Sequence, residues 1–148
     1  MRIKRGIPTR YLHGFCPGFS VVLMDWKLEL VFVPVSDVDR AKDFYVNKVG
    51  FNADFDERPS DSIRFVQLTP PGSACSICIG DGLTEAEPGT APNMQMVVSD
   101  IQAAHDQLKA NGVEVSDVDV QAWGSFVYFA DPDGNKWAVQ YIPQRPNG

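Results

Sequence analysis

The sequence predicts an α+β fold built from two copies of one βαβββ unit, and two repeated stretches lead to this prediction. The first stretch is a turn that runs into a strand-like segment. It occurs as TPPGSACSIC, residues 69–78, and again as DPDGNKWAVQ, residues 131–140. The second is an apolar segment that ends at Ser-Asp, and it occurs at residues 28–38 and 93–101. Because the Ser-Asp copies are offset by 63 residues and the turns by 62, both stretches belong to one tandem repeat.

A helix is predicted after each apolar segment. Apolar residues recur at helical spacing from Val38 to Val49 and from Ile101 to Leu108. Gly50 and Gly112 then stand at the position where a left-handed residue commonly ends a helix.

The predicted helices also have start signals. Ser36 and Ser99 can act as N-caps, because a serine hydroxyl accepts a hydrogen bond from an unpaired backbone N–H. Asp39 and Gln102 lie three residues later, where the partner in a capping box belongs.

Three strands are predicted after each helix, with turn residues between them. They span residues 51–57, 62–68 and 74–80 in the first copy, and 113–119, 125–130 and 136–142 in the second. The predicted organisation is an extension at 1–26, a first module at 27–80, a linker at 81–92, a second module at 93–142 and a tail at 143–148.

The composition of the chain argues against nucleic acid and membrane partners and indicates a reducing compartment. The net charge of −6 argues against nucleic acid, which needs clustered Lys and Arg. No apolar run approaches the roughly 20 residues of a membrane span. Three cysteines without paired spacing indicate a reducing compartment, so a cytoplasmic location is predicted. Residues 1–26 carry four bases against one acid and are expected to be poorly ordered, and we interpret Met24 as the natural start.

The tandem unit, with VSDVDRAKDFY in the first copy and DPDGNKW in the second, resembles the vicinal oxygen chelate superfamily. This superfamily includes glyoxalase I, bleomycin resistance proteins and extradiol dioxygenases, and the resemblance covers about residues 27–142. It implies a cup-shaped, partly open mixed β-barrel with the helices outside. It also implies a ligand cavity inside the cup, often a divalent metal there, and frequent homodimers that sometimes exchange halves.

The resemblance places four metal ligands, usually His, Gln or Glu, on the opening and closing strands of each copy. The matching positions in this sequence hold Leu30, Ser76, Asn93 and Ala138. Leu and Ala cannot bind a cation, and Ser and Asn are weak neutral ligands. His105, expected on a solvated helix face, and His13 are the two histidines. We therefore expect no metal cofactor, and a divalent metal at an unrecognised position is the alternative.

The cup wall is predicted from strand alternation. The valines at 31, 33 and 35 and the apolar residues at 94, 96 and 98 suit a face covered by a helix, which leaves the alternate residues for the cup. The repeated hairpin is interpreted as a device that presents one inward side chain per copy. The candidate ligand-binding residues are Leu30, Phe32, Ser76, Cys78, Asn93, Gln95, Phe126, Tyr128, Ala138 and Gln140.

Two residue types could add chemistry to this wall. Cys78 is a weak candidate nucleophile. A cysteine nucleophile needs a base beside it, and the repeat places only Lys136, and no histidine, near Cys78. Trp123, Phe126 and Tyr128 could stack a planar ligand, whereas Trp137 is expected in the core.

The first functional hypothesis is a metal-free binder of a small organic molecule, of the glyoxalase or bleomycin-resistance type and acting as a homodimer. The alternative is a diverged lyase, isomerase or dioxygenase with an unrecognised catalytic or metal site. The sequence does not decide whether a reaction is catalysed.

Overall fold

The computed structural model describes residues 24–143, of which Leu28–Pro143 form one compact unit. The expectations for residues 1–23, His13 and the tail beyond residue 143 lie outside the described residues. In chain order the elements are β1 (Leu30–Phe32), α1 (Val38–Asp43), the π-helical segment η2 (Phe44–Val49), β2 (Asn52–Ser60), β3 (Ile63–Thr69), β4 (Ser76–Asp81), β5 (Met94–Val97), α2 (Ile101–Ala110), β6 (Asp119–Gln121), β7 (Gly124–Ala130) and β8 (Lys136–Tyr141).

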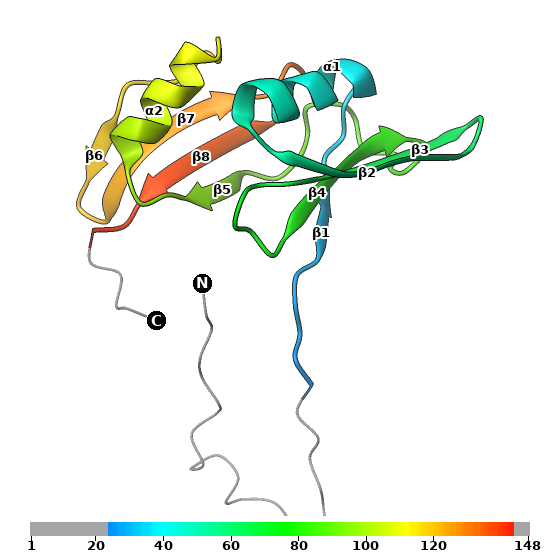
Figure 1. The fold of residues 1–148 in the computed structure, drawn as a ribbon, viewed down its shortest axis with the longest axis horizontal. Coiled ribbons are helices and arrows are strands. Elements are labelled where there is room, and N and C mark those ends of the chain that lie inside the picture. Colours follow the sequence, from blue (N-terminus) through cyan, green and yellow to red (C-terminus); the bar gives the residue numbers. More distant parts are fainter. Residues whose placement is uncertain (1–23, 144–148) are drawn as a thin grey trace, which may run out of the picture. The chain divides into compact units, whose positions relative to one another are not determined.

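The strands form two four-stranded sheets with the same topology. The first has the order β1-β4-β3-β2 and the second the order β5-β8-β7-β6. In each sheet the first two strands are parallel and the other neighbours antiparallel, so both sheets are mixed. The helices lie on one side of the sheets (Figure 1). The predicted fold class is confirmed, and the two sheets do not close into a barrel. No helix within residues 24–143 is long and apolar enough to cross a membrane.

The prediction of a strand at 113–119 is wrong for most of its length, because β6 begins only at Asp119. Ser116 explains the difference. Its backbone N–H donates to the carbonyl of Tyr128, and its side-chain hydroxyl accepts from the backbone N–H of Tyr128. In a regular strand the Tyr128 N–H would donate to a backbone carbonyl, and here the Ser116 hydroxyl takes that place. Backbone pairing with β7 then begins at Asp119.

β2 runs three residues beyond the predicted end at 57, through Pro59. Proline has no backbone N–H to donate. It is tolerated here because β2 is an edge strand, which has a neighbouring strand on one side only. The register shifts between Glu57 and Ser60, and the turn falls at Asp61-Ser62.

The prediction that Ser36 and Ser99 are N-caps is also wrong. The caps are the next residues, Asp37 and Asp100, whose carboxylates accept from the N–H groups of Arg40 and Ala103. The serine in the first copy is engaged elsewhere, since its N–H and hydroxyl both donate to Asp133. The capping boxes do not form, because Asp39 pairs with Arg64 and Gln102 donates to Asp106. Gly50, with φ of 99°, and Gly112, with φ of 84°, follow the helices as predicted.

One apolar core lies between the helices and the sheets. The side chains at 33, 94, 96 and 98 face it, as strand alternation predicts. Beyond α1 the helix widens into η2, and the N–H groups of Gly50 and Phe51 both donate to the carbonyl of Tyr45. Phe44 and Tyr45 contact the second module, where their rings pack against Phe129 and Trp137. The predicted core position of Trp137 is confirmed by its 4% exposure.

The turn at 131–135 joins the two modules. Asp131 is buried and accepts from the Tyr45 hydroxyl at 2.8 Å and from the side-chain and backbone N–H groups of Asn135 at 2.8 and 2.9 Å. Asn135 donates in turn to the carbonyl of Pro34 at 2.9 Å. The second copy of the repeated hairpin therefore does more than present an inward side chain, because it also holds the first module in place.

Candidate functional site

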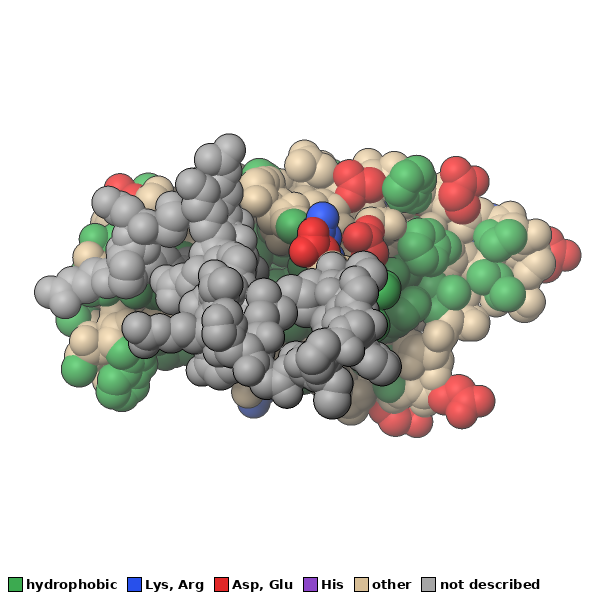
Figure 2. Space-filling view, turned by 90° about the horizontal axis from the view of Figure 1, so that it is seen from below, with side chains coloured by type: hydrophobic (Ala, Val, Ile, Leu, Met, Phe, Trp, Pro, Cys, Tyr) green, Lys and Arg blue, Asp and Glu red, His purple; other side chains and the backbone are tan. Residues whose placement is uncertain are grey.

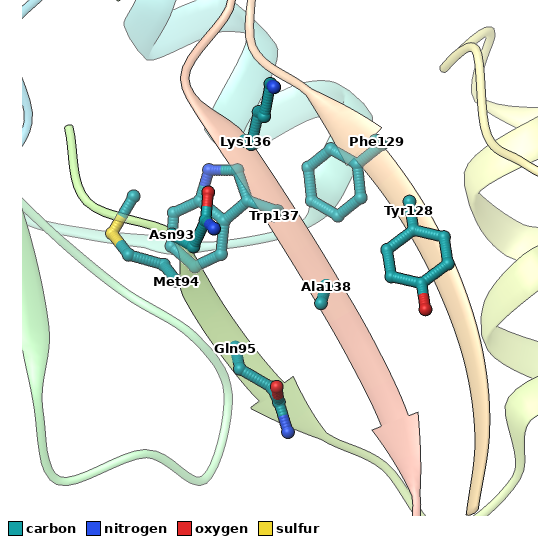
Figure 3. A pocket seen from close by; sticks show the side chains of 8 residues that line it. All are labelled: Asn93, Met94, Gln95, Tyr128, Phe129, Lys136, Trp137 and Ala138. Carbon is teal, nitrogen blue, oxygen red and sulfur yellow. The ribbon is translucent and has the colours of Figure 1, made fainter. Parts of the chain in front are cut away.

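The face of the second sheet that points away from the helices carries a cavity of about 460 Å³. Asn93 lies just before β5 and Gln95 on β5, Tyr128 lies on β7, and Lys136 and Ala138 lie on β8 (Figure 3). Met94, Phe129 and Trp137 also border the cavity, although their side chains pack with the core. We call this surface, with its cavity, the second cup face. Its wall combines a small apolar floor at Ala138 with polar groups around it, which is typical of small-molecule sites.

Two amides form one side of the second cup face. The Gln95 side chain donates to the Gln140 side-chain oxygen, and the Gln140 amide donates to the carbonyl of Trp123 at 3.0 Å. Gln140 is thereby held in one orientation, whereas Gln95 is exposed. Gln95 keeps its own oxygen and one N–H available for a ligand.

Two aromatic rings form the opposite side. Phe126 and Tyr128 are stacked, with ring centroids 6.0 Å apart and an interplanar angle of 3°. Phe126 is buried and Tyr128 is 43% exposed, so the tyrosine ring presents the accessible flat surface. Desolvation and the nearby charge of Asp119 raise the pKa of Tyr128, so that its hydroxyl remains a donor. Trp123 is exposed in the turn before β7.

The corresponding face of the first sheet, the first cup face, carries the other four predicted residues. Leu30 and Phe32 project from β1, and Ser76 and Cys78 lie opposite them on the parallel neighbour β4. Ser76 is buried, and its hydroxyl is within 2.6 Å of the Thr69 hydroxyl and accepts from Gln67 at 3.1 Å. Figure 2 views the protein from the side opposite the helices, where hydrophobic side chains gather beside acidic ones.

Cys78 is poorly suited to act as a nucleophile. Its side chain is 1% exposed, and burial raises the pKa of the thiol to about 11, opposed in part by a backbone hydrogen bond from Val66. Lys136, the predicted basic partner, lies on the other sheet. The thiolate is the reactive form of cysteine, so this environment favours a packed, inert thiol.

The ten predicted cup residues thus fall into two groups. Four of them border the cavity: Asn93, Gln95, Tyr128 and Ala138. Phe126 and Gln140 support these from the same face, and the four residues of the first module lie on the first cup face. Lys136 also borders the cavity. Strand alternation predicted it on the same face as Ala138 and Gln140, but as a basic partner for Cys78 and not as a ligand-binding residue.

The donors present do not fit the divalent metal of the superfamily. Leu30 and Ala138 have no donor atom, and the Ser76 hydroxyl is engaged with Gln67 and Thr69. Within residues 24–143 no group of three or more His, Cys, Asp and Glu side chains could hold a metal ion. His105 is less exposed than predicted, since 13% of its side chain is accessible and its Nδ1 lies 2.8 Å from a carboxylate oxygen of Asp106.

Comparison with known proteins identifies a family and several relatives. Residues 27–139 match the model of the Glyoxalase/Bleomycin resistance protein/Dioxygenase superfamily. The crystal structure of TnmS3, an antibiotic binding protein from Streptomyces sp. CB03234, is 32% identical with a TM-score of 0.74, over 82% of this chain and 99% of that one. A glyoxalase/bleomycin resistance protein from the same organism is 34% identical with a TM-score of 0.68, over 77% and 99%. YetH from Bacillus subtilis (strain 168), whose function is not described, is 29% identical over 74% of this chain and 93% of its own length.

Proposed function

Because the chain belongs to the Glyoxalase/Bleomycin resistance protein/Dioxygenase superfamily, as its sequence motifs predicted, we propose that it binds a small organic molecule on the second cup face. The observation that carries the proposal is the cavity of about 460 Å³ with exposed amides on one side and the Tyr128 ring on the other. The similarity to an antibiotic binding protein supports the same class of function.

We further propose that binding requires no divalent metal. Two of the four superfamily ligand positions hold Leu30 and Ala138, and a third holds a serine whose hydroxyl is already hydrogen-bonded. The binding energy would then come from apolar contact, aromatic stacking and neutral hydrogen bonds.

A homodimer is part of this proposal. Phe32 and Phe55 on the first cup face are exposed by more than two fifths, and a second copy of the chain would cover them. A cytoplasmic location remains a prediction from the cysteine pattern, which cell fractionation would test.

Binding is tested first by native mass spectrometry of the purified protein, with and without added zinc, nickel, manganese and ferrous ions. We expect a retained organic mass, or a ligand from an antibiotic panel that raises Tm, and no stoichiometric metal. Asn93→Leu combined with Gln95→Leu should weaken that ligand at least tenfold, because two hydrogen-bonding groups are lost. Gln102→Leu, the same change on exposed α2, is the control. Stoichiometric metal, or unchanged affinity in the double variant, would count against the proposal.

A further inference from the structure

Lys136 places a positive charge at one end of the second cup face. It lies at the start of β8 and is exposed, and the cavity wall contains no carboxylate. Ion pairs among residues 24–143 engage Arg40, Lys42, Arg58 and Arg64, and none of them includes Lys136. Among the residues that the structure describes, the cavity is therefore bordered by one cation that makes no ion pair, in a chain of net charge −6.

The opposite end of the same wall is neutral. Gln140 lies four residues farther along β8, which corresponds to about 13 Å at the rise of a β-strand. Between the two ends lies the small side chain of Ala138, and the Tyr128 ring borders it from the neighbouring strand (Figure 3). A ligand that fills this surface lies along β8, with one end at the ammonium group and the other at the amide pair.

From this arrangement we infer that the ligand is an organic anion with a planar aromatic body, such as an aromatic carboxylate, sulfonate or acidic phenol. Its charged group pairs with the Lys136 ammonium and its rings lie over Ala138 against Tyr128. Its far end exchanges hydrogen bonds with Gln95. Lys136 is then a specificity-determining residue, since it distinguishes the anion from a neutral molecule of the same shape. This inference rests on the proposed function, because it names the class of ligand for the same site.

The test uses two fluorescent dyes that differ by one sulfonate group, 1-anilinonaphthalene-8-sulfonate and neutral N-phenyl-1-naphthylamine. Each dye is titrated into the full-length protein and into Lys136→Gln, and Kd is measured. We expect Lys136→Gln to weaken the sulfonate dye about five- to tenfold, because one partly solvated charge-assisted contact is lost. Its Kd for the neutral dye should not change. In the wild-type protein, added salt should weaken only the sulfonate dye.

Two further variants make the outcome specific. Lys109→Gln removes the same charge from an exposed position on α2 and should alter neither Kd. Ala138→Trp fills the floor of the cavity and should abolish binding of both dyes. If both dyes bind but Lys136→Gln changes neither Kd, or changes both equally, the inference is overturned while the proposed function stands. If neither dye binds, or if Ala138→Trp leaves both bound, both are overturned.

Discussion

At the scale of single residues, the Tyr45 hydroxyl joins η2 to the second module through two hydrogen bonds. It donates to Asp131 at 2.8 Å and accepts from the indole N–H of Trp137 at 3.0 Å, and its residue is fully buried. Burial raises the pKa of Tyr45 far above its usual value, and the negative charge of Asp131 adds to the effect. The hydroxyl therefore stays protonated and keeps both bonds throughout the physiological range.

Tyr45→Phe tests this residue. Removing the hydroxyl leaves the buried indole N–H of Trp137 without this partner and takes one of two donors from Asp131 Oδ2, which keeps Asn135. The free energy of unfolding should therefore fall by about 1–3 kcal/mol. Urea denaturation measures the change. The control is Tyr128→Phe, whose hydroxyl is accessible and 3.4 Å from Asp119, with an expected loss below about 0.5 kcal/mol. Equal losses in the two variants would show that the buried bonds contribute nothing specific.

At the scale of elements, the linker at 81–92 is fitted to the junction between the modules. The N–H of Gly89 donates to the carbonyl of Pro34 at 3.2 Å. A Cβ atom at Gly89 would lie 2.3 Å from the carbonyl oxygen of Asp133, and the residue has φ of 84°. The linker thus passes against the turn at 131–135 with no room for a side chain.

The glycines at 89 and 72 form a matched pair for testing this contact. Gly72 has φ of 81°, close to that of Gly89, but a Cβ atom there would meet nothing within 4 Å. Gly72→Ala should therefore lose only the left-handed backbone preference, about 1 kcal/mol in the free energy of unfolding. Gly89→Ala adds the clash with Asp133 and should lose about 2–4 kcal/mol. Chemical denaturation of both variants is the measurement, and similar losses would contradict the close packing at the junction.

Sequence patterns predicted most elements because strand alternation, helical spacing and turn residues act locally. Two of the errors occurred where a side chain makes a hydrogen bond to a distant partner. The Ser116 hydroxyl accepts from the Tyr128 N–H that would have extended the pairing of β6. The Ser36 hydroxyl donates to Asp133 and does not accept from the start of α1 as a cap would. Both events need a partner 12 or 97 residues away, which no local pattern contains.

At the scale of the whole molecule, both cup faces carry exposed aromatic side chains. Phe55 and Phe32 on the first sheet are 55% and 47% exposed, and Tyr128 on the second is 43% exposed. Strand alternation predicted which residues share each face, because the period of a strand is fixed. It could not predict that the cavity lies over the second sheet, since alternation gives the face on which a side chain lies and not the space around it.

The proposed homodimer is tested by sedimentation velocity over a range of protein concentrations. We expect a species with twice the mass of the chain, and a dissociation constant raised at least tenfold in the double variant Phe32→Ser, Phe55→Ser, because buried aromatic residues dominate such contacts. Val120→Ser is the control. Val120 is exposed but lies on the opposite face of β6, so its loss should not affect association. A wild-type chain that stays monomeric at all concentrations would rule out the dimer.

The turn at 131–135 also determines when the first module can complete its folding during synthesis. It bonds to Pro34, Ser36, Arg40 and Tyr45, from 86 to 101 residues earlier in the chain. During synthesis the first helix emerges long before the residues that satisfy the Tyr45 hydroxyl and cover its ring. The first half of the chain must therefore wait, with part of its apolar surface uncovered, until nearly the last strand leaves the ribosome.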